Sequence, residues 1–259
     1  MVSFELVLAA VLGLVAGSFS NVLIYRVPRR ESILFPGSHC TSCGAAIRWY
    51  QNVPVLSWCF LGGRCARCRS RISIRYPLVE MLMGLLFALA VLRWGVTGGL
   101  PAAWAFCLFV VPLAFIDFDL HLLPDRLTDP GMVAGVAFSF AAPWTDWKAS
   151  LAGAVLGAGL PAVLIGLYAL RGVDAMGWGD VKFMALVGAF LGWRGALLTL
   201  LAGAILGTII GGGYLLVTGK GRRTPLPFGT FLAAGGLFAL FLGGPLWAWY
   251  MGLLAVGRP

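Results

Sequence analysis

The stretch GWGDVKFMALVGAFLGW, residues 177–193, places an aspartate between glycines and a long apolar run. A carboxylate at the edge of a membrane helix is costly unless it has a partner or a function. The chain around it is apolar throughout, with 60% hydrophobic and 11% charged residues among 259. A soluble domain has about 45–50% apolar and about 25% charged residues. A transmembrane barrel would alternate apolar and polar positions over about ten residues. The composition therefore predicts an all-α integral membrane protein.

The predicted fold is a polytopic bundle of about eight transmembrane helices, because about eight apolar segments approach the roughly 17–25 residues needed to span a bilayer. They lie at 3–25, 77–97, 99–118, 129–144, 149–170, 180–193, 195–217 and 227–250, the fourth and sixth being short. The first segment has its arginines after the apolar run, so it does not resemble a cleaved signal peptide. The predicted domains are a first helix at 1–25, a loop domain at 26–76 and a membrane domain at 77–259.

The distribution of lysine and arginine predicts the orientation. If the 26–76 loop is cytoplasmic and the segments alternate, 15 of the 19 basic residues fall on the cytoplasmic side. This is the bias of the positive-inside rule. The net charge of +9 is then explained by topology and by contact with anionic membrane lipid. No basic stripe interleaved with exposed aromatics is evident, so we expect no nucleic-acid partner.

The 26–76 loop carries two CxxC pairs, and their spacing suits one tetrahedral zinc site. The four candidate ligands are Cys40, Cys43, Cys65 and Cys68. Four thiolates leave no open coordination position, which indicates a structural zinc in a zinc-ribbon-like insertion. Disulfides are the alternative, and a reducing cytoplasm would argue against them. We expect Cys59 and Cys107 to be buried small hydrophobes.

Two of the ten acidic residues have local interpretations. Asp129 precedes Pro130, a pattern that predicts a helix start with Asp129 as N-cap. Glu80 lies a short way into the second apolar segment. It either pairs with a nearby arginine such as Arg75 or lines a polar cleft, and the sequence leaves both open.

Two further aspartates are candidates for catalysis. On the predicted topology, Asp117 ends the third segment and Asp180 begins the sixth, at the same membrane face. Two carboxyls sharing a site of low polarity do not both ionise easily, so one is protonated and the other is a base able to activate water. Gly177 and Gly179 would allow another backbone to approach. A structural or ion-coupling pair of aspartates is the alternative at this stage.

The motifs together resemble the type IV prepilin peptidase family, whose members carry the GxGD signature of intramembrane aspartyl proteases. The resemblance rests on GWGD at 177–180, IDFDLHLLPD at 116–125, the two CxxC pairs, and the stretches GSFSNVLIYRVPRR (17–30), WYQNVPVLSW (49–58) and RYPLVE (75–80). It covers residues 17 to about 230. It implies a bifunctional enzyme of the bacterial inner (cytoplasmic) membrane, with its zinc loop and active site facing the cytoplasm. Such enzymes cleave the short basic leader from prepilins or pseudopilins and N-methylate the new terminus with S-adenosylmethionine.

Carried onto this chain, the resemblance implies Asp117 and Asp180 as the catalytic pair and the four CxxC cysteines as the metal ligands. Asp119 is the rival of Asp117, but two residues along a helix turn a side chain by about 200°, so it should face away. The stretch PFGT at 227–230 departs from the expected PFGP, which puts the geometry of that turn in doubt.

The sequence names no residue for the methyl donor, because it has no glycine-rich loop of a soluble nucleotide-binding fold. Two other functions remain alternatives: an intramembrane aspartyl protease with another substrate, and a proton-coupled transporter using paired membrane aspartates. Transporter pairs tend to lie near the bilayer midplane.

Overall fold

The computed structural model describes residues 3–170, 172, 176–219 and 226–256, and side chains as far as 254. The regular elements within these ranges are helices, joined by loops with two isolated β-bridges. The predicted all-α class is therefore confirmed. The chain divides into two compact units, Met1–Val96 and Thr97–Pro259. The predicted domain boundaries at 25 and 76 stay predictions.

The first unit is built on two helices, α1 (Phe4–Arg26) and α3 (Arg75–Trp94). They approach closely because small residues of α1 face the α3 backbone. A β-carbon on Gly13 would lie 2.5 Å from the Met83 carbonyl oxygen, and one on Gly17 would lie 2.5 Å from the Glu80 α-carbon. This is the small-xxx-small packing of membrane helices. Glycine at these two positions thus fixes how α1 and α3 pack.

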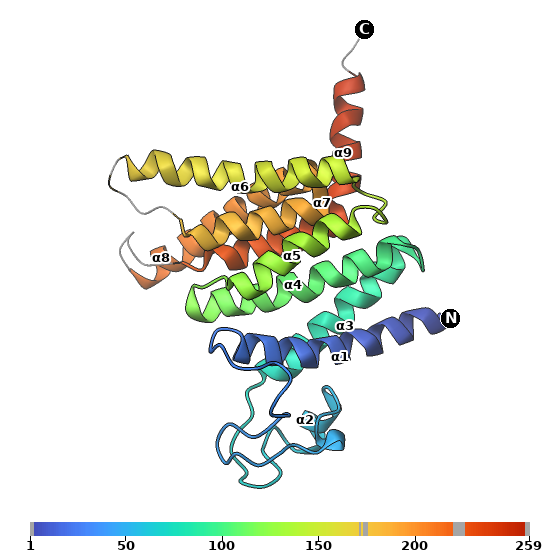
Figure 1. Cartoon of the computed structure of the whole chain (residues 1–259), viewed down its shortest axis with the longest axis vertical. Coiled ribbons are helices and arrows are strands. Elements are labelled where there is room, and N and C mark those ends of the chain that lie inside the picture. The colour runs from blue at the N-terminus through green and yellow to red at the C-terminus, as the bar shows by residue number, and fades with distance from the viewer. Residues whose placement is uncertain (1–2, 171, 173–175, 220–225, 257–259) are drawn as a thin grey trace. The chain divides into compact units, whose positions relative to one another are not determined.

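The segment between α1 and α3 contains no long helix, as Figure 1 shows in blue and cyan. Its only helical pieces are η1 (Trp49–Gln51) and α2 (Leu56–Phe60). The segment is instead organised by two turns that carry the cysteine pairs.

The second unit contains α4 (Gly99–Leu120), α5 (Asp125–Phe138), α6 (Trp147–Ala169), α7 (Trp178–Leu206), η2 (Gly207–Gly211), α8 (Gly212–Thr218) and α9 (Phe228–Val256). The first half of α7 is the core of this unit, since its residues from Asp180 to Gly192 are buried apart from Lys182. It packs tightly on α6, where Ser150 donates a 2.6 Å hydrogen bond to the carbonyl of Ala189. Figure 1 shows α6 and α7 side by side in yellow and orange.

Helix α7 is interrupted at Gly192, whose φ of 69° and ψ of 179° are not helical. The chain reverses there. Its second half returns along α9, with Gly203 against Leu232 and Gly235 against the Thr199 carbonyl. Both ends of α7 therefore lie near the start of α9. A positive φ favours glycine, which explains why this residue type stands at the turn.

Six helices in the described ranges are long and apolar enough to cross a membrane: Phe4–Arg26, Arg75–Trp94, Gly99–Leu120, Trp147–Ala169, Trp178–Thr218 and Phe228–Leu254. The predicted number was about eight, and the two counts differ at two places. Helix α5 has only 14 residues, about 21 Å, which falls below the span length. The predicted segments 180–193 and 195–217 are counted as one span of 41 residues, although the break at Gly192 separates them.

One predicted helix start is wrong. Helix α5 begins at Asp125, four residues before Asp129, and Pro130 lies inside it. Pro130 is the sixth residue of the helix, past the first turn, so its missing N–H removes one backbone hydrogen bond there. Asp129 therefore does not cap the helix.

Candidate active site and cysteine cluster

Asp117 lies in the last turn of α4 and is only 5% exposed. Its Oδ2 accepts a 2.7 Å hydrogen bond from the backbone N–H of Thr230 and lies 3.1 Å from the Thr230 hydroxyl. Thr230 is the third residue of α9, where backbone N–H groups have no partner within the helix. The Asp117 carboxylate thus caps the start of a helix that follows more than a hundred residues later.

Asp180 lies in the first turn of α7 and is 8% exposed. Its Oδ2 accepts a hydrogen bond of 3.3 Å from the backbone N–H of Gly177. The two aspartates therefore share one kind of environment, since each carboxylate lies at the N-terminus of a helix. That end carries a partial positive charge, which stabilises an anion. This accounts for two buried carboxylates in an apolar bundle.

One cavity of about 300 Å³ is lined by both Asp117 and Asp180. The structure thus brings together the two aspartates that the sequence singled out. Asp119 is exposed and does not line this cavity.

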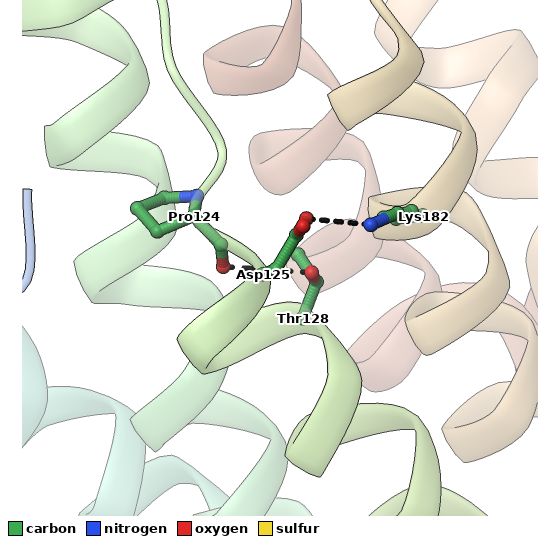
Figure 2. A network of polar contacts seen from close by, with 4 residues as sticks. All are labelled: Pro124, Asp125, Thr128 and Lys182. Carbon is green, nitrogen blue, oxygen red and sulfur yellow. Dashed lines mark hydrogen bonds and ion pairs between the residues drawn. The ribbon is translucent and has the colours of Figure 1, made fainter.

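The rim of the cavity includes an ion pair between α5 and α7. Lys182 Nζ lies 2.7 Å from Asp125 Oδ1 (Figure 2). Both residues line the cavity. In the same view, the Thr128 hydroxyl donates a 3.4 Å hydrogen bond to the Pro124 carbonyl. Because both partners of the ion pair are partly exposed, it contributes little to stability. It does join the start of α5 to the first turn of α7, beside Asp180.

The glycines around the cavity have different roles. A β-carbon on Gly229 would lie 2.9 Å from Asp117 Cγ, so glycine is required there for the carboxylate to approach α9. A β-carbon on Gly179 would lie 3.0 Å from the Leu123 β-carbon, whereas around Gly177 the nearest atom is 3.8 Å away. Only Gly177 of the predicted pair therefore leaves room for another backbone.

Thr230 and Gly229 are site residues that the sequence reasoning missed. Their stretch, PFGT, departs from the expected PFGP, and from the sequence this difference predicts only a change in local turn geometry. A proline at 230 has no N–H to donate to Asp117, so the departure bears on the site itself. The signal in the sequence was a glycine near the start of an apolar helix. The contact of that helix with α4 depends on the fold, so the sequence alone does not predict it.

The four CxxC cysteines of the first unit form one cluster, as predicted. The sulfurs of Cys40, Cys43, Cys65 and Cys68 all lie within 4.8 Å of one another, and no disulfide links them. The two turns that carry them repeat one backbone pattern. Gly44 donates to the Cys40 carbonyl at 2.8 Å, and Arg69 donates to the Cys65 carbonyl at 3.0 Å. Both donors have positive φ, 68° and 60°.

The surroundings of the four thiols are unequal. Backbone hydrogen bonds from Ser42 and Cys43 and a side-chain hydrogen bond from Ser70 lower the pKa of Cys40 to about 6. For Cys43, a backbone hydrogen bond from Ala45 is outweighed by desolvation and by the neighbouring thiols, and its pKa rises to about 11. A shared cation would remove this competition, because a coordinating thiol loses its proton outright.

The remaining cysteines behave differently from each other. Cys107 is fully buried in α4, as predicted. Cys59 is exposed at the end of α2, so the prediction that it is buried is wrong. The sequence around Cys59 is apolar, but no residue of α2 is buried.

The fold and site define a polytopic helical membrane protein with two carboxylates in one cavity and a separate four-cysteine cluster. Family models match both units: the bacterial peptidase A24 N-terminal domain at residues 11–94 and the type IV leader peptidase family at residues 104–212. The chain therefore belongs to the type IV leader peptidase family.

Curated relatives extend this similarity over most of the chain. A prepilin leader peptidase/N-methyltransferase of Burkholderia pseudomallei is 37% identical, with 94% of this chain and 87% of the relative covered. Proteins of the same name from Pseudomonas putida and Aeromonas salmonicida are 36% and 35% identical, covering 97% and 92% of this chain and 96% and 91% of the relatives. No solved structure matches.

Proposed function

We propose that this enzyme removes the leader peptide from type IV prepilins or pseudopilins, with Asp117 and Asp180 as its catalytic pair. The observation that carries the proposal is the shared cavity, lined by two buried aspartates from α4 and α7. The names of the relatives supply the substrate class.

The chemistry follows from holding two carboxyls with one proton between them. The ionised aspartate takes a proton from a water molecule, and the water oxygen attacks the carbonyl carbon of the scissile peptide. The protonated aspartate donates a hydrogen bond to the carbonyl oxygen, where negative charge develops. Collapse of the tetrahedral intermediate breaks the C–N bond, and the leaving amine takes up a proton. The helix N-termini at Asp117 and Asp180 add fixed positive ends to a site that gains negative charge.

The proposed location is the bacterial inner membrane, with the 26–76 segment and the aspartate cavity facing the cytoplasm. If the apolar segments alternate across the membrane as predicted, with α5 and both halves of α7 each crossing it, 15 basic residues fall on that side and 4 on the other, which supports this orientation. Prepilin or pseudopilin and membrane lipid are the proposed partners.

The four-cysteine cluster is proposed to hold a structural zinc. Tetrahedral coordination at about 2.3 Å from each sulfur requires sulfurs about 3.8 Å apart. Cys40 Sγ and Cys68 Sγ lie 3.8 Å apart and all four sulfurs lie within 4.8 Å of one another, so a modest contraction of the cluster would fit the ion. Zinc would stabilise a segment that has few helical hydrogen bonds of its own. Elemental analysis should give one zinc per chain.

The enzyme is also proposed to methylate the amine that cleavage creates, with S-adenosylmethionine as methyl donor. The names of the relatives support this second activity. Peptide hydrolysis uses the aspartate cavity, so we expect the methyl donor to bind at a separate site.

The test of the peptidase proposal uses purified enzyme and a prepilin, with leader removal followed by mass spectrometry. Asp117→Asn and Asp180→Asn should each abolish cleavage, because an amide neither accepts nor holds the shared proton. The double variant should be no worse, since residues that act as one unit give non-additive losses. Asp119→Asn is the matched control and should keep most activity. Full cleavage by a folded Asp180→Asn variant would overturn the assignment of Asp117 and Asp180 as the catalytic pair.

A further inference from the structure

The segment between α1 and α3 exposes several large apolar side chains, although it also carries the polar cysteine cluster. They form two groups. The first tip consists of Ile33, Leu34 and Phe35, which are 42%, 76% and 77% exposed. The second tip consists of Leu56 and Phe60, which are 56% and 87% exposed. Apolar side chains that gather on a surface in this way mark a site of interaction with a protein or a membrane.

The first tip is held at the end of α1 by a buried arginine. Arg26, the last residue of α1, donates hydrogen bonds to the carbonyls of Ser32 and Gly37 at 2.9 and 3.2 Å. Both ends of the loop that carries the first tip are therefore bonded to one guanidinium. Because an extended residue spans at most about 3.6 Å, the backbone of the first tip lies within about 10 Å of that guanidinium.

The second tip is held near the start of α3 by a buried glutamate. Glu80 Oε2 accepts a 2.7 Å hydrogen bond from the N–H of Val55, the residue before α2. Glu80 is the sixth residue of α3 and lies about 7 Å along the helix from its first residue. Helix α2 therefore begins beside the first two turns of α3.

Glu80 also lines a cavity of about 760 Å³ in this unit, together with Asn21 and Trp58. It is thus found in a polar cleft, the second of the two alternatives that its sequence context allowed. Trp58 donates a 3.2 Å hydrogen bond to the Ile72 carbonyl, which fixes one side of α2 toward the cavity.

The second tip lies on the opposite side of α2. Leu56 and Phe60 are four residues apart, so they share one face of the helix. Trp58 is two positions from each and is turned from them by about 200° and 160°. The exposed face formed by Leu56 and Phe60 is therefore directed away from the cavity.

Both tips belong to the same end of the α1–α3 pair. Helix α1 has 23 residues, about 34 Å, and α3 has 20, about 30 Å, which matches the roughly 30 Å core of a bilayer. Asn21 donates a 3.1 Å hydrogen bond to the Tyr76 carbonyl, so the end of α1 lies beside the start of α3. When the two helices cross the membrane, Arg26 and the first turns of α3 therefore lie at one membrane surface.

We propose that the 26–76 segment docks on that surface, with both tips inserted among the lipids and Arg29 and Arg30 bound to lipid phosphates. The inference makes specific the proposed contact with membrane lipid and does not depend on leader cleavage. Arg29 and Arg30 are exposed and come just before the first tip. Arginine pairs readily with phosphate, and anionic lipid attracts it. A basic leader peptide is the poorer occupant, because these arginines would repel it.

Photocrosslinking tests this docking directly. The photoreactive amino acid p-benzoylphenylalanine replaces Leu34 or Phe60 in the full-length enzyme, which is placed in nanodiscs of phosphatidylcholine and phosphatidylglycerol and irradiated. Mass spectrometry then identifies what each probe has bound. Ser42 is the matched control position, since it is exposed and belongs to neither tip. Probes at Leu34 and Phe60 should give roughly tenfold more lipid adduct than the probe at Ser42, because inserted side chains reach the acyl chains.

A second measurement tests the arginines. Arg29→Gln combined with Arg30→Gln should lower the lipid adduct at Leu34. The loss should be larger in nanodiscs that contain phosphatidylglycerol than in phosphatidylcholine alone, because anionic headgroups attract arginine more strongly. An equal yield with and without the two arginines would overturn their assignment to lipid phosphates. Thermal unfolding reports whether each variant is folded.

The outcomes distinguish lipid from protein partners. Lipid adducts at Leu34 and Phe60 no more frequent than at Ser42 would overturn the docking, and adducts at one tip only would overturn docking through both. Crosslinks mainly to a second copy of the chain, or to prepilin when it is added, would assign the surface to a protein and equally overturn the proposal.

Discussion

Replacing Gly229 with alanine should disable leader cleavage while leaving the protein folded. The added β-carbon would lie 2.9 Å from Asp117 Cγ and 3.0 Å from Leu123 Cδ1. Non-bonded carbons prefer about 3.5–4.0 Å, so Asp117 must move by roughly 0.5–1 Å. A misplacement of about 1 Å at a catalytic group costs about a hundredfold in rate. The expected result is therefore a loss of cleavage of about two orders of magnitude.

Stability should change much less than activity in this variant. Overpacking costs about 1–3 kcal/mol, and alanine recovers about 0.5–1 kcal/mol over glycine within a helix. Gly159→Ala is the control, because no heavy atom lies within 4 Å of a β-carbon there. The assay is the initial rate of leader removal in detergent or nanodiscs, with thermal unfolding measured in parallel. A folded Gly229→Ala enzyme within threefold of the normal rate would refute the claim that Asp117 must meet the α9 backbone.

Three further predictions concern single contacts. Thr230→Val keeps the N–H bonded to Asp117 but removes the hydroxyl at 3.1 Å, so the cleavage rate should fall by up to about tenfold; Thr230→Ser should be near normal, and equal rates for both would discount the hydroxyl. Arg69→Gly should raise the free energy of unfolding of the cysteine segment by about 1 kcal/mol, since Arg69 has a φ of 60°; denaturant-induced zinc release measures this, and earlier release would contradict it. Asp125→Asn should reduce cleavage by less than about fivefold and make the rate less sensitive to salt, because its pair with Lys182 is partly exposed; a complete loss would show that Asp125 takes part in the chemistry.

The fold was predictable where composition and length decide it. The apolar segments were recognisable because a membrane helix must satisfy its own backbone within one continuous run. The break at Gly192 was also visible, since the sequence separated 180–193 from 195–217. The start of α5 was not, because Pro130 lies inside this helix although an Asp–Pro pair usually marks the start of one.

The site was predictable only in part. Asp117 and Asp180 could be chosen because few acidic residues occur in this chain and each is costly in lipid. The residue that binds the Asp117 carboxylate could not be predicted, because Thr230 contacts Asp117 across 113 positions of sequence. The environment of Glu80 could not be predicted for the same reason. Its carboxylate accepts a hydrogen bond from the N–H of Val55, 25 residues earlier, in a segment without periodic structure.

Because each aspartate binds the start of a helix, catalysis and folding stability depend on the same two residues, although these two properties usually oppose each other. Active-site residues are commonly held at some cost in stability, so replacing them often stabilises an enzyme. Here Asp117 and Asp180 also bind backbone N–H groups of α9 and α7. Losing such a cap costs about 0.5–2 kcal/mol. Selection for a well-folded protein and selection for an active one would therefore retain the same two carboxylates, and an alanine at either position would be penalised twice.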